Sequence, residues 1–207
     1  MRRALALVVW AVVSAAWAAQ TPAPPRPQAV PLPHMEVDAS RSEVRFLLDT
    51  TWHVVEGHAK DVTGTVTSDS GDPFVDGRIS IEVKTATMQT GNGRRDKDMR
   101  EVMAVQQHPT IKFVSTAAPE TVSITRLPNG SVKEAVLNIP GDLTIRGVTH
   151  QITLPATVYR QQEGYRVNGD VVVSLAEYKI PDPSIFVNKV KDKVGLTVDV
   201  YVHASAR

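Results

Sequence analysis

Residues 194–202 read VGLTVDVYV, so Val or Leu occupies every second position and other residues fill the positions between them. Side chains of a β-strand point to opposite faces in turn, and this alternation therefore predicts a strand with one buried face. The same period of two recurs in residues 44–48, 78–83 and 151–158. The body of the chain is expected to consist mainly of such strands.

Turn signals separate the alternating segments. Gly, Asp, Asn and Pro cluster at residues 70–72, 76–77, 128–130 and 163–164. About eight or nine strands are expected, and they do not alternate with helices as the strands of a parallel sheet do. The pattern predicts an antiparallel all-β domain, either a barrel or a sandwich.

One segment departs from this period. Residues 96–107 read DKDMREVMAVQQ, which places Met99, Val102, Met103 and Gln106 at helical spacing. Acidic residues stand at its start and Pro109 follows its end, as helix boundaries favour. We expect a single short helix over residues 96–107 that covers one end of the strand layer.

The N-terminus has the features of an export signal. Arg2 and Arg3 precede an uncharged run over residues 4–17, and Ala16-Trp17-Ala18 supplies a small-x-small cleavage pattern. The run is shorter than the roughly 20 residues that span a bilayer. Residues 1–18 are therefore predicted to be a cleavable signal peptide, with an uncleaved anchor as the alternative. Cleavage would leave no stable membrane span and a periplasmic protein.

Residues 19–34 contain six prolines, which favour an extended linker and oppose sheet formation. This linker is interpreted as an inert leader or, alternatively, as a docking segment. The folded domain is expected over residues 35–205.

Composition excludes several classes of protein. The chain has 207 residues, 23 Lys and Arg against 22 Asp and Glu, and no Cys. Near-neutral charge argues against nucleic-acid binding, and the lack of Cys excludes disulfides and thiolate metal sites. The sequence has no Gly-x-Ser-x-Gly elbow, and its histidines lack metal-ligand spacing. Neither an enzyme nor a metal or cofactor site is therefore predicted.

Five segments in order carry a resemblance to a known family. They are DASRSEVRF at 38–46, RDKDM at 95–99, HPTIKF at 108–113, GDLTIRGVT at 141–149 and DKV at 192–194. With these segments the chain resembles the YceI-like family, the lipocalin-like polyisoprenoid-binding proteins of bacteria. Family members can form homodimers, and no apolar stripe in this sequence decides whether this chain does.

The resemblance implies an eight-stranded antiparallel lipocalin-like barrel with one inserted short helix. It further implies that a long isoprenoid lipid, of polyprenyl or quinone type, is held in an apolar tunnel for storage or transport. The inward apolar residues expected to line the tunnel are Val44, Phe46, Leu48, Ile79, Ile81, Val83, Ile111, Phe113, Leu143, Ile145 and Val173. The alternative is that these residues pack a solid core and that the barrel is a non-catalytic protein-interaction module.

Other residues are expected at the ends of the tunnel. Met99 and Met103 have adaptable side chains that suit closure of one end. Arg94 and Arg95 follow a glycine-rich turn, where an anionic head group or a quinone oxygen would be recognised; the alternative is a simple turn with Asp96 capping the helix. His53 is the candidate polar ligand contact, or else a hydrogen-bonded histidine of the barrel wall.

Overall fold

A long hairpin formed by β8 (Val132–Ile145) and β9 (Val148–Gln161) contains the GDLTIRGVT segment. The two residues between the strands, Arg146 and Gly147, have φ angles of 50° and 74°. Two consecutive residues in the left-handed region form a two-residue hairpin turn, and the twist of this turn matches that of the strands it connects. The turn fixes the register, in which Ile145 pairs with Val148 and Leu143 with His150.

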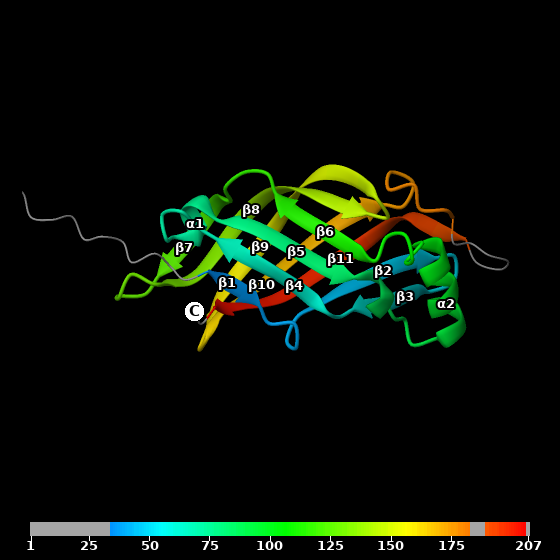
Figure 1. The fold of residues 1–207 in the computed structure, drawn as a ribbon, viewed down its shortest axis with the longest axis horizontal. Coiled ribbons are helices and arrows are strands. Elements are labelled where there is room, and N and C mark those ends of the chain that lie inside the picture. Colours follow the sequence, from blue (N-terminus) through cyan, green and yellow to red (C-terminus); the bar gives the residue numbers. More distant parts are fainter. Residues whose placement is uncertain (1–33, 183–188, 206–207) are drawn as a thin grey trace, which may run out of the picture.

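The computed structural model describes residues 34–182 and 189–205, and Figure 1 shows the path of the chain. The other strands are β1 (Met35–Val37), β2 (Glu43–Thr50), β3 (Val54–Ala59), β4 (Val62–Thr67), β5 (Arg78–Lys84), β6 (Thr110–Ser115), β7 (Glu120–Arg126), β10 (Gly164–Ser174) and β11 (Val190–Ala204). The helical elements are α1 (Pro73–Asp76), the 3₁₀ turn η1 (Thr85–Thr87) and α2 (Gly93–Val102). The predicted signal peptide and all but the last residue of the predicted linker lie outside the described residues.

The sheet closes on itself with eight strands around the circuit. The hydrogen-bonded order β1-β4-β5-β6-β8-β9-β10-β11 is completed by pairing between β1 and β11. Nearer to α2, β2 takes the place of β1 as the strand paired with β11. There β3, which pairs with β2, takes the place of β4. The prediction of an eight-stranded antiparallel barrel is therefore confirmed. The eleven strands exceed the eight or nine expected, because β1 and β2 are separate, as are β3 and β4, and because β7 pairs only with β8 among the described residues.

Apolar side chains fill the half of the barrel farther from α2. Ala135, Ala156 and Val200 are each at most 2% exposed there. At the end of this half, the ring of Phe74 from α1 meets Tyr165 of β10 edge to face, with ring centroids 5.4 Å apart. This half is a packed core, and Figure 1 shows α1 and α2 at opposite ends of the barrel.

The helix occupies different residues from those predicted. It begins at Gly93 and ends at Val102, whereas residues 96–107 were expected. Asn92 is its N-cap, because the side-chain oxygen of Asn92 accepts a hydrogen bond from the backbone N–H of Arg95 at 3.1 Å. Ala104 has a φ of 49°, which ends the helix before Pro109 is reached. The alternative in which Asp96 caps the helix is wrong, since Asn92 takes that position.

Candidate functional site

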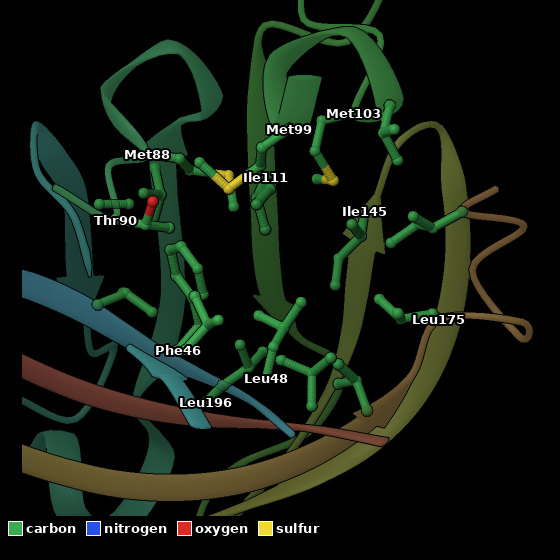
Figure 2. Close-up of a pocket in the computed structure, with 18 of the residues that line it drawn as sticks. Phe46, Leu48, Met88, Thr90, Met99, Met103, Ile111, Ile145, Leu175 and Leu196 are labelled. Carbon is green, nitrogen blue, oxygen red and sulfur yellow. The ribbon is translucent and has the colours of Figure 1, made fainter. Parts of the chain in front are cut away.

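An apolar cavity of about 660 Å³ occupies the half of the barrel next to α2. Its wall comes from inward positions on strands β2, β3, β5, β6, β8, β9, β10 and β11. Because inward side chains recur every second residue, short valines and leucines from facing strands leave a space along the barrel axis. Figure 2 shows Phe46, Leu48 and Leu196 on the strand wall, across the cavity from Met99 and Met103.

The roof of the cavity is α2 together with the turn over residues 175–180. Met99, Val102 and Met103 contribute from the helical side, and Leu175 and Ile180 contribute from the turn. Met103 is only 6% exposed. The roof is thus as apolar as the wall, and it is built from flexible methionine side chains that adapt to an irregular surface.

The β8–β9 turn holds the two parts of the roof together. Arg146 donates from Nε to the carbonyl oxygen of Val102 at 2.9 Å and from a terminal guanidinium nitrogen to the carbonyl oxygen of Lys179 at 2.9 Å. These carbonyl groups belong to the end of α2 and to the 175–180 turn. The hydrogen bonds from the rigid guanidinium fork fix both segments relative to the hairpin.

Among the described residues, the polar side chains on the cavity wall are confined to the α2 end. They come from the end of β2 and the turn that follows it, from the segment leading into α2, and from the first turns of α2. The set is Thr50, His53, Thr90, Asn92, Arg94, Arg95 and Asp98. An apolar molecule with one polar group would match this arrangement with its polar group at the α2 end.

A polar network around Thr90 positions the start of α2. The carboxylate of Asp96 is 7% exposed and accepts hydrogen bonds from the backbone N–H of Thr90 at 2.8 Å and from the Thr90 hydroxyl at 2.5 Å. Arg95 donates from Nε to that hydroxyl at 2.7 Å and from a terminal nitrogen to the Thr90 carbonyl at 3.0 Å. Asp96 therefore ties the helix to the preceding segment.

The two arginines differ in their surroundings. The guanidinium of Arg95 is engaged with Thr90, whereas Arg94 is exposed and forms no ion pair with any residue in the described part of the chain. Both residues touch the cavity. Of the two, Arg94 is the one whose charge is available to a group at the polar, α2 end of the cavity.

The structure brings most of the predicted site residues to one cavity. Twelve of the thirteen line it, namely Phe46, Leu48, His53, Ile81, Val83, Arg94, Arg95, Met99, Met103, Phe113, Leu143 and Ile145. Ile79 does not line it, because it stands one inward position below Ile81 and packs against the core. Contact of these residues with a ligand remains a prediction.

Several wall residues were not singled out from the sequence. Leu196 and Val198 belong to the VGLTVDVYV strand, and the alternation of this strand could have identified them as inward-facing. Met88 and Thr90 follow the η1 turn, where no periodic pattern marks them. Only the closure of the barrel shows that these residues face the same space as Phe46.

The interior is neither a tunnel along the whole barrel nor a solid core. The cavity wall reaches Ile81, Leu154 and Val198, and the next inward residues on the same strands, Ile79, Ala156 and Val200, belong to the packed half. The expected lengthwise tunnel is thus a cavity with one closed end. The alternative of a solid core holds only for the half away from α2.

Acidic residues near α1 serve the local fold. Asp72 caps α1 by accepting from the backbone N–H of Phe74 at 3.0 Å, Asp69 pairs with Arg78, and Asp76 accepts from Ser68 and Ser70. Hydrogen bonds from Ser68 and Ser70 hold the pKa of Asp76 below its usual value. Over residues 34–182 and 189–205, no three His, Asp or Glu side chains converge as metal ligands.

The same described residues include no helix whose length and apolar character would let it span a membrane.

Comparison with solved structures shows the same fold. A polyisoprenoid-binding domain from Saccharophagus degradans aligns with a TM-score of 0.66 and 13% identity, covering 83% of this chain and 98% of that one. Burkholderia cenocepacia BcnA aligns with a TM-score of 0.62 and 20% identity, covering 80% of this chain and 98% of BcnA. A YceI protein from Campylobacter jejuni gives a TM-score of 0.52 at 17% identity, covering 74% of this chain and 86% of that one.

Comparison of sequences also finds relatives of this chain. A UPF0312 protein from Pseudomonas savastanoi is 32% identical over 137 residues, which cover 62% of this chain and 65% of the relative. The chain thus spans just under two thirds of the length of this relative. A family model described as the YceI-like domain matches residues 35–204, which is nearly the whole barrel. The chain therefore belongs to the YceI-like domain family.

Proposed function

We propose that this protein binds an isoprenoid lipid, of polyprenyl or quinone type, in the α2-end cavity and stores or carries it outside the cytoplasm. One observation carries the proposal: an apolar cavity of about 660 Å³ has polar side chains at a single end. Enclosing an apolar chain stabilises the complex by roughly 25 cal/mol for each Å² removed from water. A space this large and this apolar is expected to be occupied in a protein exposed to lipid.

The polar end of the cavity supports a direction for the ligand. The prenyl tail would lie between Phe46, Leu143 and Leu196, while the head group would lie near His53 and Arg94. Arg94 can donate to a phosphate or a quinone oxygen, and His53 can donate or accept according to its tautomer. Placing the polar group elsewhere would bury it against hydrocarbon without a hydrogen-bond partner, which is costly.

Family membership and a structural neighbour support the ligand class. The Saccharophagus degradans structure, which shares the fold at 13% identity, is described as a polyisoprenoid-binding domain. A slim, flexible prenyl chain suits an eight-stranded barrel, whose interior is wide enough for one small ligand.

We propose binding without catalysis. At the α2 end, Arg95 of the cavity wall and the neighbouring buried Asp96 are hydrogen-bonded to Thr90 and hold α2 in place. The remaining polar groups at that end suffice to orient a head group. A catalytic role would be revealed by a bound lipid that is chemically altered after long incubation.

The test is native mass spectrometry with lipid extraction, applied to the full chain expressed in a bacterium. A prenyl lipid should accompany the purified protein, and the Ile81→Trp variant, which fills part of the cavity, should carry less of it. Val114→Trp on the neighbouring strand is the matched control, because Val114 is 45% exposed on the outer face. Folded protein that takes up no prenyl lipid when offered one would overturn the proposal.

Export is a separate part of the proposal, since it rests on residues 1–18. Intact mass of the protein from a periplasmic extract should correspond to a chain that begins at Ala19. Recovery of the uncleaved chain from the membrane fraction would favour the anchor instead.

A further inference from the structure

The closed end of the cavity is formed by a layer of side chains across the barrel. Ile81, Leu154 and Val198 are the deepest wall residues on their strands. One inward position farther along, Ala156 and Val200 are each 2% exposed and belong to the packed half. Beyond them, Phe74 and Tyr165 close the other end of the barrel.

The packed half leaves a ligand no path through the barrel. Close-packed interiors have few voids larger than a water molecule, so a chain could advance past Ala156 only if this core were taken apart. The second, smaller cavity of about 120 Å³ is lined by Asp38, Arg41, Glu163 and neighbouring residues, and it does not extend the first. A ligand must therefore enter and leave through the half of the barrel next to α2.

The volume sets how much chain can be enclosed. A carbon group in a packed interior occupies on the order of 20–25 Å³. The cavity of about 660 Å³ therefore holds roughly 26–33 carbon atoms, or about five to six and a half isoprene units of five carbons each. Additional units of a longer chain have no apolar wall to contact and stay outside the mouth.

We infer that the packed half of the barrel sets an upper limit on the length of prenyl chain that this protein encloses, at about six isoprene units. This inference rests on the proposed function and adds a specificity to it. Shorter chains gain affinity with every unit added, because each unit buries more apolar surface. A longer chain leaves its surplus units outside the cavity, where they bury no further apolar surface and add no affinity.

The test is a series of prenyl alcohols with one head group and with three, four, six, eight and eleven isoprene units. Affinity for the delipidated protein is measured by competition against one bound fluorescent prenyl probe. Affinity should rise by about tenfold or more per unit up to six units. From six to eleven units it should change by less than about threefold. A continued rise beyond eight units would overturn the length limit.

A pair of variants tests whether the volume of the cavity sets the length limit. Val171 of β10 lines the cavity, whereas its neighbour Val172 is 63% exposed on the outer face. Val171→Trp adds roughly the volume of one isoprene unit, so its plateau should begin about one unit earlier than that of the unsubstituted protein. Val172→Trp should leave the series unchanged.

The outcomes separate this inference from the proposed function. If no prenyl alcohol binds at any length, the proposed function itself fails. If chains bind but affinity increases steadily with length, prenyl binding stands and the closed end does not limit it. If Val171→Trp does not fold, the series on the unsubstituted protein still decides the question.

Discussion

The ring of Phe46 on β2 lies against the backbone of Gly57 on β3, its cross-strand partner. A methyl group at position 57 would overlap the ring and would also press on the backbone carbonyl of Gln89 at 2.8 Å. Gly57 thus lets the ring lie close to the barrel wall, which leaves the space beside it open. The absence of a side chain at one position helps to set the volume of the cavity.

Gly57→Ala should therefore reduce both stability and ligand capacity. The ring of Phe46 must turn into the cavity, and overpacking of this kind costs about 1–3 kcal/mol of unfolding free energy. The measurement is urea unfolding together with prenyl-lipid uptake by native mass spectrometry.

The double variant Gly57→Ala/Phe46→Leu supplies the control. A smaller side chain at position 46 relieves the overlap, so part of the lost stability and uptake should return. The Gln89 carbonyl still opposes the methyl group, and full recovery is not expected. An alanine variant with unchanged stability and uptake would contradict the account of Gly57.

Arg146→Ala should loosen the roof of the cavity. Its guanidinium bonds the carbonyls of Val102 and Lys179, and their loss frees the end of α2 from the 175–180 turn. Two hydrogen bonds from a charged donor predict a loss of about 2–4 kcal/mol. Hydrogen exchange should accelerate at residues 99–107 and 175–180, and bound lipid should dissociate faster.

Arg160→Ala is the matched control, because Arg160 is an exposed arginine near the other end of β9. It should leave the hydrogen exchange of the roof unchanged. Equal effects of the two substitutions would show that the roof does not depend on Arg146.

The strands and the cavity wall were predictable because a strand with one buried face has a fixed period. Val194 and Leu196 occupy every second position of their strand, and once the barrel closes they face the same space as Phe46. Ile79 has the same pattern as Ile81, yet it lies in the packed half. Periodicity shows which side of a sheet a residue faces, but it does not show how far along the barrel side chains fill the interior.

The start of α2 was not predictable for a different reason. Asp96 and Asn92 are both good helix caps, and the sequence alone favoured Asp96 because it precedes the apolar spacing. In the fold, Thr90 offers Asp96 two hydrogen-bond donors, which leaves Asn92 to cap the helix. The choice depends on a tertiary contact between the helix and the segment that follows η1.

Tyr178→Phe should leave stability unchanged or raise it by up to about 1 kcal/mol. Tyr178 is 1% exposed, its ring meets His150 edge to face, and its hydroxyl has no hydrogen-bond partner among the described residues. Phenylalanine keeps the ring contact and removes the unpaired hydroxyl. A loss of more than 1 kcal/mol would mean that the hydroxyl has a partner, such as a bound water.

The same tyrosine predicts a loss of stability in alkaline solution. Burial, and then the charge of Glu177, raise the pKa of Tyr178 to about 12, from 10.0. The unfolded chain releases this proton first, so unfolding becomes easier as the pH rises from 10 toward 12. Tyr178→Phe should reduce this loss of unfolding free energy, whereas Tyr159→Phe, at a residue 41% exposed, should not.

Asp199 predicts the opposite dependence, in acid. Its carboxylate is 8% exposed and accepts two hydrogen bonds from the guanidinium of Arg166, one of them from Nε at 2.8 Å. These bonds hold the pKa of Asp199 below its usual value of 3.8. The unfolded chain takes up this proton first, so the pair stabilises the fold above that value and loses its effect as the pH falls through the folded pKa.

Asp199→Asn should therefore cost stability at neutral pH and less in acid. A buried pair broken on one side loses several kcal/mol, but the Arg166 side chain is 40% exposed and water replaces part of the interaction. We expect a loss of about 1–2 kcal/mol at pH 7, measured from urea unfolding, and a smaller difference near pH 3. Asp69→Asn, in an exposed pair with Arg78, should change stability by less than about 0.5 kcal/mol. A difference between Asp199→Asn and the unsubstituted protein that stays constant from pH 7 to pH 3 would show that the charge of Asp199 is not what stabilises this end of the barrel.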